Sequence, residues 1–341
     1  MRSIPARYRS LAVLAAITVA GVGLPWVVTG FQSLQLSYVL IFAIAMLGLN
    51  ILTGNSGQIS LGHGAFMAVG AFVTAIGMQR FGMNMFLTFP ISALVCGVLG
   101  FLIGLPALRL EGIYLALATF ALGVGAPDLL RKPAGITGGV RGIIVPPVTS
   151  PFDWLQDEQY FYYICLAVAA IVFLVAWNLL HGKIGRAWRS IRDSELAARS
   201  SGINLAGYKT LAFAVSAAFA GLSGSLLGLA NGFVSADSYQ VTLSIAVLVG
   251  SIIGGIGTIE GAIIGGFINE FLPTESHDFV YQFNPSLSTA APGITQGLLL
   301  LLIIFFARDG IAGIIRVTYY RLRLRALGRR EAETETLPKA V

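Results

Sequence analysis

Long apolar stretches separated by short polar segments follow one another along most of the chain, and four of them contain no charged residue. These four are Leu11–Val28, Leu34–Leu52, Phe86–Leu108 and Phe161–Leu180. A helix needs ~20 mainly apolar residues to cross a hydrocarbon core of about 30 Å. A charge at mid-membrane costs about 2.5–3.5 kcal/mol even on the most lenient insertion scale. The pattern therefore predicts membrane-spanning helices.

Over the whole chain, the same pattern predicts an all-α integral membrane protein with about ten transmembrane helices, some of them broken or half-length. The expected spans are Leu11–Val28, Leu34–Leu52, Ser60–Met78, Phe86–Leu108, Ile113–Leu130, Phe161–Leu180, Thr210–Leu229, Val241–Gly257, Ile259–Leu272 and Leu287–Ala307. Ile259–Leu272 is short and interrupted by glycine, which indicates a half-helix or one part of a broken pair.

Glycine-rich segments mark two places where a helix is expected to break, Gly54–Gly64 and Gly254–Gly261. Runs of glycine allow a membrane helix to be interrupted where its exposed ends line a cavity. Glycines also let helix backbones pack closely, and this second interpretation stays open. The candidate residues for a translocation path or a helix break are Gly57, Gln58, Ser60, Gly62, His63, Gly64, Gly254, Gly255, Gly257, Glu260 and Gly261.

Composition supports a membrane protein, because the 341 residues are only 11% charged, whereas a soluble domain carries about 25%. Arg2, Arg7 and Arg9 before the first apolar run resemble a secretory signal. That run is longer than a typical signal core and many spans follow it, so we expect a retained first helix. Cys96 and Cys165 lie in apolar spans without metal-type spacing, and we expect them to be small packing residues.

The positions of lysine and arginine predict the orientation of the chain. With ten spans and both termini in the cytoplasm, 18 of the 22 basic residues lie on the inside. The chain then divides into a cytoplasmic N-terminus (1–9), a transmembrane domain (10–307) that includes the cytoplasmic loop 181–209, and a basic cytoplasmic tail (308–341). The Pro- and Gly-rich segment 131–158 is expected outside.

Motifs for nucleotide and metal chemistry are missing from the sequence. The only Gly-Lys pair, Gly182-Lys183, is followed by Ile184 and does not fit a phosphate-binding loop. A dinucleotide-binding glycine motif and a His-Glu-x-x-His zinc motif are also missing. We expect no catalytic residue, no metal site and no cofactor on this chain, and a membrane-embedded enzyme is the least supported class.

Ionisable residues of the kind that ion-coupled carriers use are few, and they lie near predicted span ends or at a glycine turn. They are His63, Asp128, Glu260 and Glu270. A hydrogen-bonded structural role is favoured for His63 over a path-lining one, and a turn or helix-cap role for Glu260 over a proton relay. An ion-coupled carrier or channel with Asp128, Glu260 and Glu270 as ion sites is the alternative class.

The basic segment 181–209 contains the pattern of a short helix. Ser190 and Asp193 resemble a capping box, and Gly202 lies where a C-terminal cap is expected. A helix over about Ser190–Ser201 has too little apolar surface to be stable alone, so it needs a surface to dock against. The lipid headgroups and a groove on a soluble partner are both open from the pattern alone.

The segment also carries a family resemblance. The cytoplasmic coupling loop of branched-chain amino acid ATP-binding-cassette (ABC) permeases, of the LivM-like type, resembles Gly185-Arg186-Ala187-Trp188-Arg189-Ser190-Ile191-Arg192-Asp193-Ser194-Glu195, followed by Gly202-Ile203-Asn204 and Tyr208-Lys209. Further similar stretches are Asn50–Phe66, Leu108–Leu117, Thr137-Gly138-Gly139 and Gly254–Gly266. The resemblance covers nearly the whole chain after the first helix.

This resemblance implies a type II ABC importer-like permease fold in a bacterial inner membrane. The residues it assigns to ATPase coupling are Gly185, Arg186, Arg189, Ser190, Ile191, Asp193, Glu195 and Gly202. The implied partners are a second, homologous permease, two ATPase subunits that bind ATP and Mg, a periplasmic substrate-binding protein and membrane lipid, but no nucleic acid. The implied cargo is a branched-chain or other small hydrophobic amino acid, with urea or a short amide as the alternative.

Overall fold

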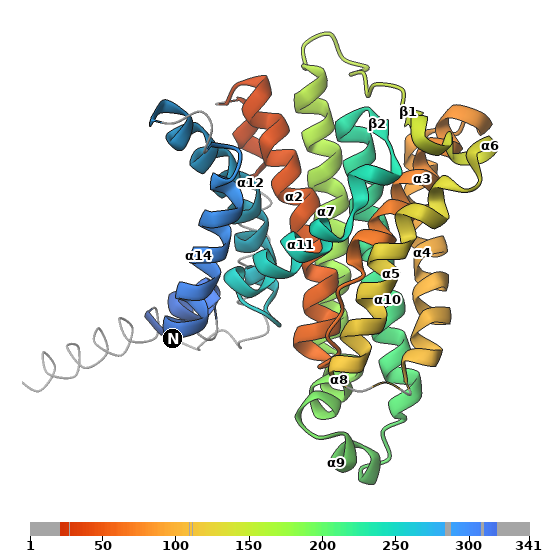
Figure 1. Cartoon of the computed structure of the whole chain (residues 1–341), viewed down its shortest axis with the longest axis vertical. Coiled ribbons are helices and arrows are strands. Elements are labelled where there is room, and N and C mark those ends of the chain that lie inside the picture. Colours follow the sequence, from red (N-terminus) through yellow and green to blue (C-terminus); the bar gives the residue numbers. More distant parts are fainter. Residues whose placement is uncertain are drawn as a thin grey trace, which may run out of the picture.

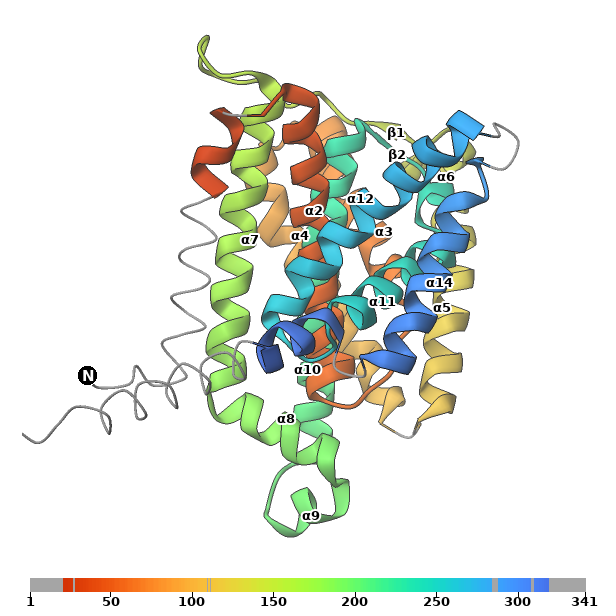
Figure 2. The same ribbon diagram turned by 90° about the vertical axis from the view of Figure 1, so that its left-hand side faces the viewer.

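A computed structural model describes residues 21–26, 28–108, 110, 112–283, 288–307 and 310–318. The predicted N-terminus 1–9, most of the first predicted span and most of the basic tail lie outside these residues. The described part is built almost entirely of helices (Figures 1 and 2).

The elements follow one another along the chain as a series of long helices, joined by turns or by segments that contain short helices and strands. The long helices are α2 (Gly30–Leu49), α3 (His63–Phe81), α4 (Met85–Ala107), α5 (Ile113–Arg131), α7 (Asp157–His181), α10 (Leu205–Asn231), α11 (Val241–Gly254), α12 (Ile259–Phe283) and α14 (Ala291–Phe306). The short helices are η1 (Leu24–Trp26), η2 (Asn50–Asn55), α6 (Ala134–Thr137), η3 (Gly139–Arg141), α8 (Lys183–Asp193), α9 (Glu195–Ser200) and η4 (Ala236–Tyr239). Two short strands, β1 (Ile143–Ile144) and β2 (Phe233–Val234), pair antiparallel.

Local sequence signals explain several of the helix ends. Thr29, Asn84 and Asn204 each precede a helix, and each side chain accepts a hydrogen bond from a backbone N–H of the first turn, which supplies a partner that the helix itself cannot. At the other end, Gly82 after α3 and Gly232 after α10 adopt left-handed φ values of 59° and 64°, a conformation that only glycine takes without strain.

In the described part of the chain, seven helices are long and apolar enough to cross a membrane. They are Gly30–Asn55, His63–Phe81, Met85–Ala107, Ile113–Arg131, Asp157–His181, Leu205–Asn231 and Ala236–Gly254. An eighth span results if Ala291–Phe306 and Gly310–Thr318, bent by 46°, count as one. The predicted number of about ten is therefore approximate, and the predicted span Leu11–Val28 falls mostly outside the described residues.

The prediction of a short helix over Ile259–Leu272 is wrong. α12 continues without interruption to Phe283 and passes through Pro273. Glu275 and Asp278 follow Leu272 and interrupt the apolar pattern there, which is why the predicted span ends too early. Helical geometry nevertheless tolerates these side chains, and the 25-residue helix is long enough to cross a bilayer.

Helix α10 is the central helix, and it packs against α2, α3 and α4. Close approach depends on small residues: a Cβ atom on Gly224 would lie 1.9 Å from the Met67 carbonyl oxygen, and one on Gly70 would lie 2.1 Å from that of Gly221. Buried serines add hydrogen bonds, because the Ser225 hydroxyl lies 3.1 Å from the Gly70 carbonyl oxygen and 2.7 Å from the Ser92 hydroxyl. Lipid is as apolar as the helix surfaces, so the hydrophobic effect does not drive membrane helices together. They associate through close packing of small residues and through interhelical hydrogen bonds.

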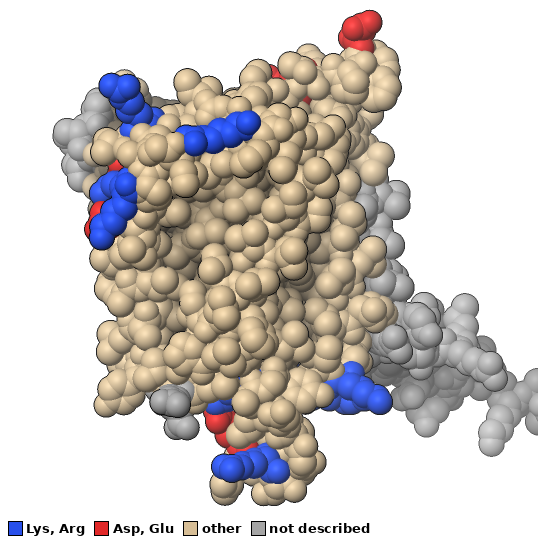
Figure 3. Space-filling view, turned by 90° about the vertical axis from the view of Figure 1, so that its right-hand side faces the viewer, with Lys and Arg blue, Asp and Glu red and all other residues tan. Residues whose placement is uncertain are grey.

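One face of the molecule is apolar over its middle. Figure 3 shows charged side chains at the two ends of one face and an uncharged band between them. On α4 and α5, large apolar side chains such as Leu94, Phe101, Leu117 and Leu129 are exposed. Such a band would be unusual in water and is what a hydrocarbon solvent requires. The chain is therefore a multi-pass membrane protein.

The two ends of the molecule differ. Helices α8 and α9 project from one end, while β1, β2 and α6 lie at the opposite end (Figures 1 and 2). The predicted external segment 131–158 contains α6, η3 and β1, and β1 pairs with β2 after α10, so this segment is tied to the helix bundle. These two-residue strands are an addition to the predicted all-α fold.

Candidate functional site

Two interruptions of the helical backbone lie at the expected glycine-rich segments. In the first break, residues 50–62, α2 passes into the π-helical turn η2, and the chain then runs without regular structure to the start of α3 at His63. In the second break, residues 254–258, α11 ends and α12 starts at Ile259. Gly57, Gly255 and Gly257 have φ values of 77°, 126° and 77°, which residues other than glycine rarely adopt.

The two breaks are in direct contact. A Cβ atom on Gly54 would lie 2.3 Å from the backbone nitrogen of Gly257, so only glycine fits at this position. Buried asparagines join the same segments: Asn50 donates from Nδ2 to the Thr258 carbonyl (3.0 Å), and Asn55 donates to the Gly257 carbonyl (3.4 Å). These amides supply partners for backbone groups that the broken helices leave unpaired in a water-poor environment.

Loop 181–209 differs from the predicted single helix over Ser190–Ser201. Helix α8 starts at Lys183, immediately after α7, and α9 forms a separate turn of helix from Glu195. The capping residue is Ser194, whose hydroxyl accepts from the Ala197 N–H (3.3 Å), so the predicted Ser190–Asp193 capping box is wrong. The hydroxyl of Ser194 reaches the free N–H groups because Ser194 is extended, whereas Ser190 is helical.

The predicted C-terminal cap at Gly202 is confirmed. Gly202 has a φ of 79°, and its N–H donates to the Arg199 carbonyl (3.0 Å). The N–H of Ile203 donates to the Ala198 carbonyl (3.0 Å), a pattern that satisfies the last carbonyls of a helix.

Helix α8 is fixed to the membrane domain by buried side chains. Trp188 is fully buried and donates from Nε1 to the Tyr208 carbonyl (2.8 Å). Ile191 is 1% exposed, and a Cβ atom on Gly185 would lie 2.1 Å from the Leu180 carbonyl oxygen. Among the predicted coupling residues, Gly185 and Ile191 therefore face the protein interior.

Arg192 makes a direct link between α8 and the first break. Its Nη1 donates to the Gly54 carbonyl (2.9 Å), while Nε and Nη2 donate to Asp193 Oδ1 (3.2 and 3.1 Å). Asp193 thus orients the guanidinium, and Gly57 packs against the Arg192 side chain, where a Cβ atom would lie 3.1 Å from Cγ. Since Gly54 also touches Gly257, a continuous contact runs from α8 through both breaks.

A second set of contacts holds α9 and the first break to the start of α10. Lys209 is buried, and its Nζ lies 2.6 Å from Glu195 Oε1. Gln58 is also buried and donates from Nε2 to the Lys209 carbonyl (3.3 Å) and the Ser56 hydroxyl (2.7 Å). Glu195 and Gln58, predicted for coupling and for the break respectively, therefore meet at one residue.

Several other predicted residues are buried or closely packed. Ser60, Gly62 and Gly64 are buried near α5 and α11: Gly62 lies against Thr119, and the Gly64 N–H donates to the Ser244 hydroxyl (2.8 Å). Gly254 and Gly261 pack backbone to backbone, since a Cβ atom on Gly254 would lie 2.0 Å from the Gly261 carbonyl oxygen.

His63 and Glu260 occupy structural positions. His63 is buried, and its Nε2 lies 2.9 Å from the Ser216 hydroxyl, which agrees with the favoured hydrogen-bonded role. Glu260 lies in the first turn of α12, 3.7 Å from Arg316. The cap of α12 is provided by Thr258, whose hydroxyl accepts from the Gly261 N–H (3.1 Å).

The outer face of loop 181–209 is open. Arg186, Arg189 and Asp193 are exposed, and Ser190 is half-buried. Leu196 on α9 is 80% exposed, and α9 lies at the far end of the projection seen in Figure 2.

Sequence reasoning did not single out Arg192, Asn50, Asn55, Lys209 or Leu196. Asn50 and Asn55 carried a usable signal, because amides inside an apolar span are expensive unless they have a structural or functional partner. Arg192 and Leu196 carried none beyond their place in the loop, since their roles depend on which segment lies opposite.

Long apolar helices with two joined breaks, and a projecting loop hydrogen-bonded to one of them, characterise this multi-pass membrane protein. The chain belongs to the family described as branched-chain amino acid transport system / permease component, whose sequence profile matches residues 33–307. The family consists of permeases, so the prediction that the chain is not an enzyme is confirmed.

Individual relatives agree with this family. The chain is 33% identical over 279 residues to the high-affinity branched-chain amino acid transport system permease protein LivM of Escherichia coli, covering 75% of this chain and 66% of LivM. It thus spans just under two thirds of the length of that relative. It is 23% identical over 288 residues to LivH of the same organism, covering 80% of this chain and 91% of LivH.

The fold also matches a solved structure. PsaBC from Streptococcus pneumoniae, in complex with Fab, is similar with a TM-score of 0.50 at 15% identity, covering 86% of this chain and 97% of that chain. At this identity the likeness concerns the fold alone. The predicted type II importer-like permease fold is confirmed.

Proposed function

We propose that this chain is one of two permease subunits of an ABC importer that carries branched-chain or other small hydrophobic amino acids into the cytoplasm. Its relatives LivM and LivH are both named permeases for branched-chain amino acids, which supports the cargo and a second, homologous permease as partner. Two ATPase subunits would bind ATP and Mg, and a periplasmic binding protein would deliver the cargo.

The observation that carries this proposal is the contact from the projecting loop to the two breaks. Helix α9 carries the exposed Leu196, while α8 is held by Trp188 and reaches Gly54 through Arg192. Movement of a partner docked on α9 would therefore act on both breaks, which touch at Gly54 and Gly257. ATP hydrolysis by the partner ATPases would move loop 181–209, so this chain needs no phosphate-binding motif of its own.

The orientation follows from the same function. The end that carries α8 and α9 faces the cytoplasm, where ATP is, and the end that carries β1 and β2 faces the periplasm. The excess of basic residues in loop 181–209 and the tail supports this orientation. The localisation is then the bacterial inner membrane, with both termini in the cytoplasm.

Co-purification tests the proposal. The tagged chain is purified from gently solubilised membranes, and we expect the second permease and an ATPase to purify with it. In the double variant Leu196→Glu and Arg199→Glu, the docking surface carries the wrong charge, so the ATPase yield falls about tenfold or more, while the second permease is retained.

A matched control is Val140→Glu, because Val140 is 81% exposed at the opposite end, as Leu196 is 80% exposed on α9. This control keeps the ATPase. A chain that purifies alone and transports leucine in liposomes without ATP, driven by an ion gradient, would overturn the importer proposal.

A further inference from the structure

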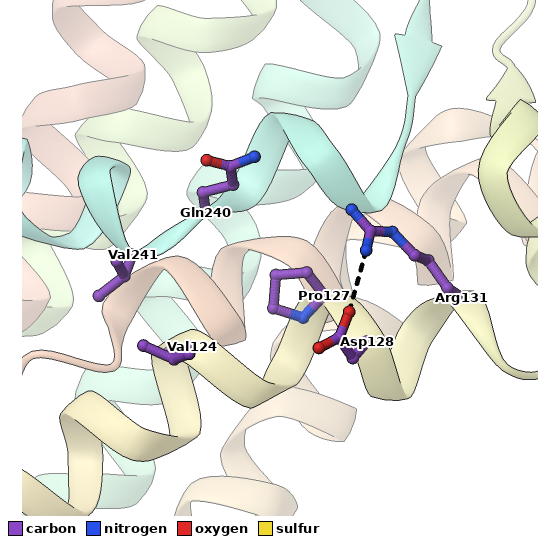
Figure 4. A pocket seen from close by; sticks show the side chains of 7 residues that line it. Val124, Pro127, Asp128, Arg131, Gln240 and Val241 are labelled. Carbon is purple, nitrogen blue, oxygen red and sulfur yellow. Dashed lines mark hydrogen bonds and ion pairs between the residues drawn. The ribbon is translucent and has the colours of Figure 1, made fainter.

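A hollow of about 230 Å³ lies between α5 and the η4–α11 segment, at the end opposite α8 and α9. Figure 4 shows that apolar and charged side chains separate within it: Val124 and Val241 lie at one end, and Asp128 and Arg131 at the other. Gly123, Pro127 and Gln240 complete the lining.

The charged end has free capacity for hydrogen bonds. Arg131 donates from Nη1 to Asp128 Oδ1 (2.9 Å) and from Nη2 to Asp237 on η4. Its Nε is buried and has no hydrogen-bond partner among the described residues. The buried Nε does not face the hollow, but the Arg131 side chain is 35% exposed. Each Nη nitrogen carries a second N–H group, and these outer N–H groups are the ones that can meet an acceptor in the hollow.

Asp128 and Gln240 remain accessible beside this donor. The Asp128 side chain is 72% exposed although it is paired with Arg131, and a carboxylate accepts several hydrogen bonds. Two carboxylates, Asp128 and Asp237, share one guanidinium. An incoming ammonium group at Asp128 would thus meet excess negative charge, and Gln240 brings an amide donor from the facing segment.

The apolar end provides for a small aliphatic side chain. Val124, Pro127 and Val241 form the wall, and Gly123 forms a closely packed floor, because a Cβ atom there would lie 3.4 Å from Val241 Cγ2. Pockets that bind small molecules combine such apolar walls with a few convergent polar groups. A positive and a negative group beside an aliphatic wall match the chemistry of a zwitterionic amino acid.

We propose that this hollow is a binding site for the zwitterion of an aliphatic α-amino acid. The ammonium group binds Asp128, the carboxylate binds Arg131 and Gln240, and the side chain lies on Val124, Pro127 and Val241. The site is on the face that receives cargo, so this inference rests on the proposed import function and assigns the residues that hold the cargo.

Position in the fold links this site to the first break. Thr119, one helical turn before Gly123 on α5, accepts a hydrogen bond from the Leu61 N–H at its hydroxyl (3.0 Å). A Cβ atom on Gly123 would lie 3.1 Å from the Leu61 carbonyl oxygen. The floor of the hollow is therefore in contact with the segment that Arg192 holds at its other end.

Binding of radiolabelled leucine to the complete permease–ATPase complex in lipid nanodiscs, without binding protein, tests the site. Competitors are leucinamide, which lacks the carboxylate, and 4-methylpentanoate, which lacks the ammonium. In the wild type, both analogues compete about tenfold or more weakly than leucine, because each leaves one charged partner without its ligand.

The variants give a signature that a purely structural ion pair would not. In Asp128→Asn, leucine loses its advantage over 4-methylpentanoate but keeps it over leucinamide. In Arg131→Gln, the preference over leucinamide disappears and the preference over 4-methylpentanoate remains. Lys132→Gln, the next residue along and exposed, leaves both preferences unchanged.

Uptake by the same complexes with binding protein and ATP separates this inference from the proposed function. If wild-type uptake is ATP-dependent but leucine does not bind the nanodisc complex saturably, or if both variants keep both preferences, the site is wrong and the importer stands. If the wild type shows no ATP-dependent amino acid uptake, the importer proposal fails.

Discussion

Arg192 is the side chain on which the connection between loop 181–209 and the membrane domain depends. Its hydrogen bond satisfies a carbonyl at the end of η2, where the backbone has no helical partner. Asp193 fixes the guanidinium from the other side. A planar guanidinium makes both contacts at once, which the ammonium of lysine does less well.

We therefore expect Arg192→Gln to uncouple ATP hydrolysis from uptake. A hydrogen bond to a charged group contributes about 1.5–3 kcal/mol, so leucine uptake per ATP hydrolysed should fall about tenfold or more. Reconstituted complexes in proteoliposomes measure both rates. Arg192→Lys should lie between the wild type and Arg192→Gln.

Lys183→Gln is the matched control, since Lys183 is exposed at the start of α8, and it should couple normally. An unchanged ratio of uptake to ATP hydrolysis in Arg192→Gln would show that the hydrogen bond to Gly54 does not couple the loop to the first break. Gly185 and Ile191 are unsuitable positions for this test, because both are packed inside and their substitution would disturb the fold.

At the level of single residues, the sequence predicted the positions of the segments better than it predicted the contacts between them. The breaks near Gly54 and Gly257 and the cap at Gly202 could be predicted because each depends on backbone conformations that glycine adopts freely. The division of the loop into α8 and α9 could not, because Ser190 and Ser194 are both plausible caps for a helix in this segment, and only Ser194 caps one, α9. Ser190 instead lies inside α8, which the buried Trp188 holds against Tyr208.

At the scale of elements, the crossing of α3 and α10 determines how tightly the bundle packs. Gly224 faces the Met67 carbonyl so closely that a methyl group would overlap the backbone of α3. Residues without side chains allow this approach, and the serines beside them add hydrogen bonds that lipid cannot provide.

Gly224→Ala should consequently destabilise the protein by about 1–3 kcal/mol through overpacking. The midpoint of thermal unfolding in detergent measures the loss. Gly125→Ala is the control, because Gly125 lies in α5 with nothing within 4 Å of the added Cβ. This control should be neutral or slightly more stable, as alanine favours the helix by about 1 kcal/mol over glycine.

Equal melting temperatures for the two variants would mean that α3 and α10 separate more readily than the structure indicates. Element boundaries from sequence were accurate to one residue for α4 and α5, where hydrophobicity defines the span. They failed for α12, whose acidic side chains interrupt the apolar pattern without interrupting the helix.

At the scale of the whole molecule, the proposed orientation places loop 181–209 and the paired strands on opposite sides of the membrane. The native cysteines provide a clean background for testing this, because Cys96 and Cys165 are both buried. Single cysteines are introduced as Ser200→Cys on α9, at an exposed position, and as Ser150→Cys in segment 131–158, at a half-buried position at the opposite end.

In intact spheroplasts, a membrane-impermeant maleimide should label the cysteine at position 150 and leave the one at position 200 unlabelled. Inside-out vesicles should give the reverse, and detergent should allow both to react. Labelling of position 200 in intact spheroplasts would reverse the orientation and remove the ATPase from the reach of α9.

The contact between Gly54 and Gly257 also limits how this sequence can change over evolutionary time. In an ordinary core, a larger side chain on one helix is compensated by a smaller one opposite, so pairs of positions exchange volume and drift together. Here the contact is between backbone atoms, and neither glycine has a side chain that a substitution could make smaller. No second substitution can therefore offset a larger side chain at either position. Purifying selection must act on each glycine separately for as long as the two breaks remain joined.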